Sequence, residues 1–171
     1  MILIHCALLC EAQIFIESLK LKKTNSFPKI YSNDKYIALV SGVGKENTIN
    51  GLNYIFNKYT IQKALNIGIA GSADTSINIG EIFSINHNIK NIKSIKLSTV
   101  DKIELSSNKK DRVYDMEGNY FLEYCQNKLE QNNIYIIKIV SDHLEDKILS
   151  KEFIKQLINK HKKIILEISS T

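Results

Sequence analysis

The chain contains 171 residues, of which 44% are hydrophobic, so one globular domain with its own core is expected over residues 1–171. The formal net charge is +5, yet Arg112 is the only arginine and the lysines are scattered along the chain. Because arginine is the side chain best suited to phosphates and guanine edges, the composition disfavours a nucleic-acid-binding protein.

The first half of the sequence alternates between apolar runs typical of strands and stretches with helical spacing. The clearest strand, at residues 36–41, ends at a Gly-Val-Gly turn that leads into a helical pattern. The patterns predict strands at 2–8, 29–31, 36–41 and 64–69, and helices at 11–20 and 45–58.

The second half continues the alternation around a polar stretch rich in serine and lysine. We predict strands at 80–86, 92–98 and 134–140, an exposed loop at 99–112, and helices at 115–131 and 151–168, the last with Ser150 as its N-cap. Strands that alternate with helices are typical of a sheet covered on both faces. The predicted fold class is therefore α/β, with a mostly parallel twisted central sheet flanked by helices.

Three cysteines with no repeating spacing indicate reduced thiols and predict a cytoplasmic protein. The first apolar run is too short to span a bilayer and has neither a basic leader nor a small-residue cleavage site, so no membrane partner is expected. His5, Cys6 and Cys10 lie close together, but adjacent strand residues point to opposite faces of a sheet. A buried thiol and a core histidine are therefore favoured over a metal site.

Three acidic residues follow the ends of predicted strands. Glu11 comes after the first strand, Glu117 precedes a helix, and Asp142 closes the strand at 134–140. In open α/β sheets the ligand crevice lies beyond the carboxyl ends of the strands, so these acids can converge on one pocket. Each alone also fits a simpler reading, as an ordinary acid of a helix terminus or a solvated loop.

The turn Gly42-Val43-Gly44-Lys45 invites comparison with a phosphate-binding loop. A Walker motif requires a glycine five positions before Gly44, where this chain has Leu39, and it requires serine or threonine after the lysine, where this chain has Glu46. We therefore reject a phosphate loop. The turn is expected to let backbone amides approach a ligand or water.

Six short motifs occur in an order that resembles one known family. They are Ala7 to Glu11, Ser41-Gly42-Val43-Gly44-Lys45, Asn66 to Gly71, Ile79-Gly80-Glu81-Ile82, Asp115-Met116-Glu117-Gly118, and Ser141-Asp142. Together they resemble the nucleoside phosphorylase and nucleosidase superfamily, most closely its methylthioadenosine/S-adenosylhomocysteine nucleosidase branch. The resemblance covers both ends of the chain, whereas the middle is shorter than in the family, so a truncated version of that fold is expected.

The resemblance implies the catalytic residues of a purine nucleosidase. Asp142 would protonate or hydrogen-bond the imidazole-ring nitrogen of the purine, with Ser141 orienting its carboxyl group. Glu11 would orient and deprotonate the attacking water. Cleavage of an N-glycosidic bond passes through a sugar with oxocarbenium character, so a proton donor on one side and a base for water on the other are the groups required.

The resemblance also implies the residues that bind the substrate. Glu117 would hold the ribose hydroxyls, Met116 would pack on the sugar, and the backbone of Ala70 and Gly71 would form a wall for the ligand. A homodimer is implied as well. No metal and no organic cofactor is implied.

Several positions depart from the family pattern. Ile69 stands where relatives usually carry a small hydroxyl residue, and Lys138 stands where an arginine is frequent. Phosphorylases bind phosphate with several arginines, so the single arginine of this chain favours hydrolysis over phosphorolysis. The segment 88–112 is short and polar and lacks the aromatic residue that stacks on the base, leaving Tyr114, Tyr120 or a partner subunit to supply it.

Two functions follow from these observations. The first is a hydrolytic nucleosidase for a purine nucleoside with a modified 5′ group, with futalosine-type nucleosides included. The second is a non-catalytic relative that binds a nucleoside or serves as an interaction subunit. The presence of all three acids favours the enzyme, whereas the shortened middle favours the binding protein.

Overall fold

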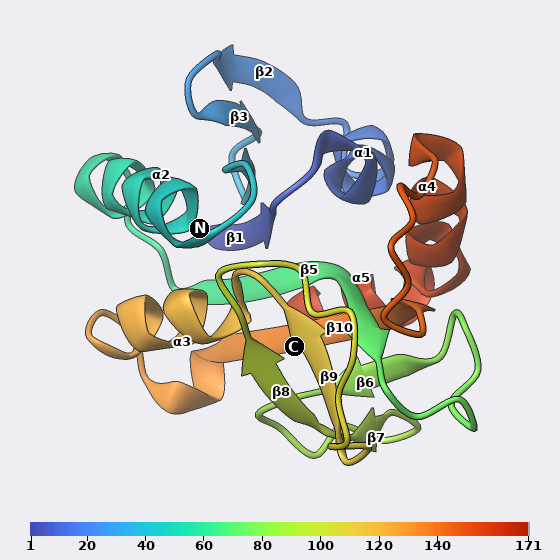
Figure 1. The fold of residues 1–171 in the computed structure, drawn as a ribbon. Helices are drawn as coiled ribbons and strands as arrows, with labels where there is room; N and C mark the ends of the chain where they lie inside the picture. The colour runs from blue at the N-terminus through green and yellow to red at the C-terminus, as the bar shows by residue number, and fades with distance from the viewer. Residues whose placement is uncertain (171) are drawn as a thin grey trace.

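A computed structural model describes residues 1–170 and contains a ten-stranded sheet between two layers of helices (Figure 1). Its central strands lie in the order β4-β1-β5-β10, and each is parallel to its neighbours. Their bounds are β1 Ile2–Cys6, β4 Tyr36–Val40, β5 Lys63–Ser72 and β10 Ile134–Asp142. The carboxyl ends of these strands therefore share one edge of the sheet. The predicted α/β class with a parallel centre is confirmed.

The outer strands are shorter and partly antiparallel. On one side β3 pairs antiparallel with both β4 and β2, and on the other β6 pairs antiparallel with β10 and parallel with β7. A branch formed by β8 and β9 pairs with the end of β5 through β9. Their bounds are β2 Lys22–Asn25, β3 Lys29–Ser32, β6 Ile82–Ser84, β7 Lys93–Ser94, β8 Lys96–Thr99 and β9 Arg112–Asp115.

The helices cover both faces of the sheet, with α2 and α3 on one side and α1 and α4 on the other (Figure 1). The helix α5 packs in the same layer as α1 and α4. Their bounds are α1 Leu9–Ser18, α2 Lys45–Lys58, α3 Gly118–Gln126, α4 Lys151–Lys160 and α5 Lys162–Ser170, with a turn of 3-10 helix at Gln131–Asn133. No helix within residues 1–170 combines the length and the apolar character needed to cross a membrane.

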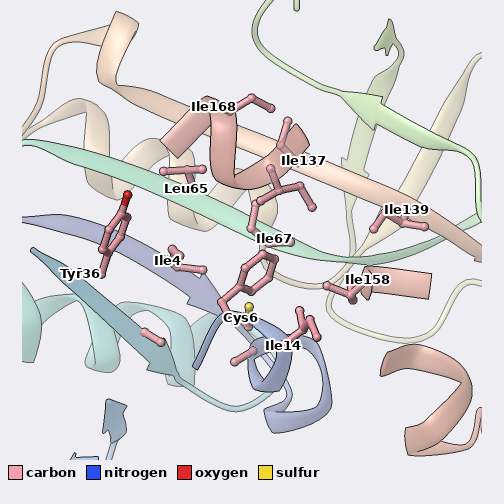
Figure 2. Packing of buried hydrophobic residues seen from close by; sticks show 14 of the residues in the cluster. Ile4, Cys6, Ile14, Tyr36, Leu65, Ile67, Ile137, Ile139, Ile158 and Ile168 are labelled. Atoms are coloured by element: carbon pink, nitrogen blue, oxygen red, sulfur yellow. The ribbon is translucent and has the colours of Figure 1, made fainter. Parts of the chain in front are cut away.

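Alternating side chains of the parallel strands divide between two cores. Ile4 and Cys6 of β1 pack with Ile67 of β5 against the layer of α1, α4 and α5 (Figure 2). Leu3 packs in the opposite core, against α2 and α3. Because His5 stacks on Phe121 of α3 while Cys6 lies in the other core, the two point to opposite faces as predicted.

The structure corrects several predicted boundaries. The first helix begins at Leu9 instead of residue 11, because the amide of Leu8 finds an acceptor in the side chain of Glu11. The helix predicted at 115–131 spans only Gly118–Gln126. The helix predicted at 151–168 is interrupted at His161, whose imidazole donates a hydrogen bond to the carbonyl of Gly80. Ser150 caps α4, as predicted.

The region predicted as a strand at 92–98 and a loop at 99–112 is also more divided than expected. It contains two short strands, β7 and β8, and its last residue already belongs to β9. Because β9 pairs with the end of β5, it carries Asp115 to Glu117 to the carboxyl edge of the parallel strands. This placement completes the cavity at that edge of the sheet.

Candidate active site

A cavity of about 490 Å³ opens at the carboxyl edge of the central strands. All seven residues predicted for the site line it: Glu11, Ala70, Gly71, Met116, Glu117, Ser141 and Asp142. They come from the start of α1, the ends of β5 and β10, and the connection between β9 and α3. The parallel arrangement therefore brings together side chains that are more than 100 residues apart.

Glu11 is buried at the base of this cavity, with 3% of its surface exposed. One carboxylate oxygen accepts a hydrogen bond from the amide of Leu8 at 2.8 Å, and the other accepts from the amide of Ile69 at 3.0 Å. Burial raises the pKa of Glu11 to about 7, although these two amides and the charge of Lys138 act to lower it. A carboxyl group with that pKa can accept a proton from water near neutral pH.

Glu117 is buried and immediately precedes α3. Although it occupies the N-cap position of α3, its side chain does not cap that helix. Instead, its Oε1 accepts a hydrogen bond from the amide of Gly44 at 2.8 Å. Gly44 has a φ of 91°, a conformation that favours glycine, so the glycine turn positions Glu117 rather than a phosphate.

Asp142 is the last residue of β10 and is held by its neighbours in the sequence. Its Oδ2 accepts a hydrogen bond from the hydroxyl of Ser141 at 2.6 Å, and its Oδ1 accepts from the amide of Leu144 at 2.9 Å. A Cβ atom on Gly71 would lie 2.8 Å from Leu144 Cδ2 and 3.0 Å from Asp142 Oδ1. A side chain at position 71 would therefore displace Leu144 or the carboxyl group of Asp142 from this arrangement.

His5 is buried and hydrogen-bonded through both ring nitrogens. Its Nδ1 accepts from the amide group of Asn66 at 2.8 Å, and its Nε2 then donates to the hydroxyl of Ser41 at 2.8 Å. Ser41 in turn donates to the carbonyl of Gly42, at the turn that carries Gly44. Burial and the charge of Lys138 lower the pKa of His5 to about 3, so this imidazole is neutral and serves to support the turn.

Two site residues carry no predicted role, Asp115 and Lys138. Asp115 lines the cavity and is buried, and its Oδ2 forms an ion pair with Lys138 Nζ at 2.6 Å. The same oxygen accepts from the amide of Gly118 at 2.8 Å. Asp115 adjoins Met116 and Glu117 in sequence, and Lys138 is a charged residue in the middle of an apolar strand, which are the signals that could have identified the pair.

Two connections also contribute to the cavity lining, one with Val100, Ile103 and Glu104 and the other with residues 144–149. Ile103 and Ile148 are exposed there, the latter almost completely. Of the two tyrosines considered for stacking on a base, Tyr114 lines the cavity, whereas Tyr120 donates a hydrogen bond to Asp101 at the surface. Among residues 1–170, no group of three or more His, Cys, Asp or Glu side chains is arranged to hold a metal ion.

No protein-family model matches this sequence, and no curated protein matches it either. Solved structures do match, from end to end. A 5′-methylthioadenosine/S-adenosylhomocysteine nucleosidase of Helicobacter pylori, an aspartate-to-asparagine mutant with 5′-methylthioadenosine in its active site, superposes with a TM-score of 0.83 at 14% identity, covering 99% of this chain and 97% of that chain.

Two further structures show the same similarity. The nucleosidase of Neisseria meningitidis in complex with methylthio-immucillin-A has a TM-score of 0.82 at 16% identity, covering 99% of each chain. The futalosine hydrolase of Helicobacter pylori has a TM-score of 0.81 at 14% identity, covering 99% of this chain and 97% of that chain. The resemblance drawn from the six motifs is thus confirmed for the fold, and the chain has the fold that the methylthioadenosine/S-adenosylhomocysteine nucleosidases share with futalosine hydrolase.

Proposed function

We propose that this protein is a hydrolytic purine nucleosidase that cleaves the N-glycosidic bond of a nucleoside with a modified 5′ group. The observation that carries the proposal is the convergence of Glu11, Glu117 and Asp142 on one cavity, whose volume of about 490 Å³ suits a small-molecule ligand. The similar folds belong to nucleosidases whose structures hold 5′-methylthioadenosine or methylthio-immucillin-A. They support the same class of substrate here.

The proposed reaction assigns one task to each acid. Glu117 holds the ribose hydroxyls and Met116 packs on the sugar, which places C1′ between the other two carboxyl groups. As the bond from C1′ to the purine breaks, its electron pair passes to the base, and Asp142 gives a proton to the imidazole-ring nitrogen. Water attacks C1′ and loses a proton to Glu11, so the products are the free base and the free sugar.

Hydrolysis is favoured over phosphorolysis by the charge of the cavity. Its lining contains seven carboxyl groups and a single cationic side chain, that of Lys147. The acids are Glu11, Glu104, Asp115, Glu117, Asp142, Glu145 and Asp146. A phosphate dianion would meet repulsion from these groups and no arginine among the lining residues, whereas neutral water would not.

A base-release assay tests the proposed function. Purified protein at high concentration is mixed with 5′-methylthioadenosine, with adenosine and with futalosine, and free base is measured by chromatography. Base release from at least one of them, without added phosphate, is expected. If none of them yields free base, the enzyme proposal is wrong and the non-catalytic nucleoside-binding protein takes its place. The homodimer and the cytoplasmic location stay predictions.

Replacing Glu117 by glutamine is expected to weaken nucleoside binding roughly ten- to hundredfold, because the ribose hydroxyls would lose a charged acceptor. The amide oxygen of glutamine can still accept from Gly44, so the turn should keep its conformation. Calorimetric titration with an uncleavable nucleoside analogue measures the change. Glu123→Gln, on the same helix but outside the cavity lining, is the matched control. Equal affinities of the two variants would contradict the ribose-binding role.

A further inference from the structure

Lys138 is a cation buried within the central sheet. It lies in the middle of β10 with 1% of its surface exposed, and its Nζ is 2.6 Å from Asp115 Oδ2. It is not among the residues that line the cavity, so it does not reach a ligand there directly. A buried ammonium group is costly unless it is paired, which indicates that its surroundings require the charge.

Lys138 and Glu11 flank a position that has no side chain, Gly68. Lys138 and Gly68 are register partners in the neighbouring strands β10 and β5 (Figure 1). A Cβ atom on Gly68 would lie 3.0 Å from Glu11 Oε1 and 3.5 Å from Lys138 Nζ. Glycine at this position thus leaves open the space between the carboxylate and the ammonium group.

Three carboxyl groups from three different elements face Lys138. Asp115 of β9, Glu117 at the start of α3 and Glu11 of α1 raise the pKa of Lys138 against the effect of burial, which lowers it. The remaining titratable neighbours are His5, whose pKa burial and Lys138 lower, and Cys6, whose pKa burial raises. Lys138 is therefore the one cation facing three carboxyl groups, and the other two neighbours are neutral.

We infer that Lys138 is a positioning residue of this site, whose buried ammonium group is the shared counter-ion that allows Glu11 and Glu117 to be ionised together in one cavity. Without it, two carboxylates facing the same ligand would repel each other, and one of them would retain a proton. The role rests on the proposed function, in which Glu11 must be ionised to take a proton from water. The lysine acts through the acids and not through contact with substrate.

The test is a titration of Glu11 that needs no substrate. Glutamate labelled at its carboxyl carbon is incorporated into the protein, and the NMR signal of Glu11 is identified by its loss in Glu11→Gln. In Lys138→Met, which keeps the unbranched chain up to the terminal amine and removes the charge, the titration midpoint of Glu11 should rise by about one to three pH units. In Lys138→Arg, which keeps the charge, it should stay close to the wild-type midpoint.

A folded Lys138→Met protein with an unchanged midpoint would overturn the inference. Should that variant fail to fold because Asp115 is left unpaired, Lys138→Gln, whose amide group can still donate a hydrogen bond to Asp115, removes the positive charge alone and carries the same expectation and the same contrary result. Because this titration uses no nucleoside, it separates the two proposals. Absence of base release by the wild type would defeat the proposed function, whereas an unmoved midpoint would defeat the role of Lys138 alone.

Discussion

Asp142→Asn is expected to slow the release of a purine base by about two to four orders of magnitude while leaving the fold intact. Asparagine cannot donate the proton that the departing purine needs. Its oxygen can still accept from the amide of Leu144, and its amide group can donate to the hydroxyl of Ser141 in place of the present bond. The loop should therefore keep its conformation. Steady-state rates with the best substrate of the base-release assay measure the effect.

The leaving group offers a sharper control for the same variant. A riboside of 4-nitrophenol releases an anion that is stable without protonation, so its cleavage should be nearly as fast in Asp142→Asn as in the wild type. Asp146→Asn, another acid of the cavity lining on the same connection, should leave both rates close to the wild-type values. Equal slowing of both substrates by Asp142→Asn would refute its role as the acid.

The meeting of the acids in space could be predicted because it depends on topology alone. Glu11 and Asp142 each follow a strand of the parallel centre, and parallel strands that are neighbours end at one edge. The apolar runs of β1, β4, β5 and β10 are strong enough to define those strands from sequence. Once the order of motifs indicated the fold, Glu11 and Asp142 could both be assigned to the crevice at the carboxyl edge of the sheet.

The contacts that support the acids could not be predicted, because they join residues far apart in the chain. The bond from the amide of Gly44 to Glu117 spans 73 positions, and nothing local distinguishes it from an ordinary turn. Lys138 was visible as a departure from the family, but its partner depends on where the short strand β9 pairs. The strand β9 was itself missed, because four residues of mixed polarity carry too little periodicity.

The rate of base release is expected to fall about tenfold for each pH unit below 7, because the pKa of Glu11 is raised to about 7 by burial and its protonated form cannot take a proton from water. Glu11→Gln should remove this acid limb and lower the rate by about two to four orders of magnitude at pH 8. Values of kcat/KM measured between pH 5 and 9 test both effects. Glu17→Gln, an exposed acid of the same helix, is the control.

The pH dependence of the free energy of unfolding provides a second measurement of the pKa of Glu11, with no substrate present. The ordinary pKa of this carboxyl is 4.5 and the folded value is about 7, so the folded state prefers the protonated form. That preference stabilises the fold at low pH and is lost as pH rises through 7. Between pH 4.5 and 8 the wild type should therefore lose about 3 kcal/mol of unfolding free energy relative to Glu11→Gln. A constant difference between the two proteins would mean that Glu11 is already ionised in acid, and the acid limb of the rate would then belong to another residue.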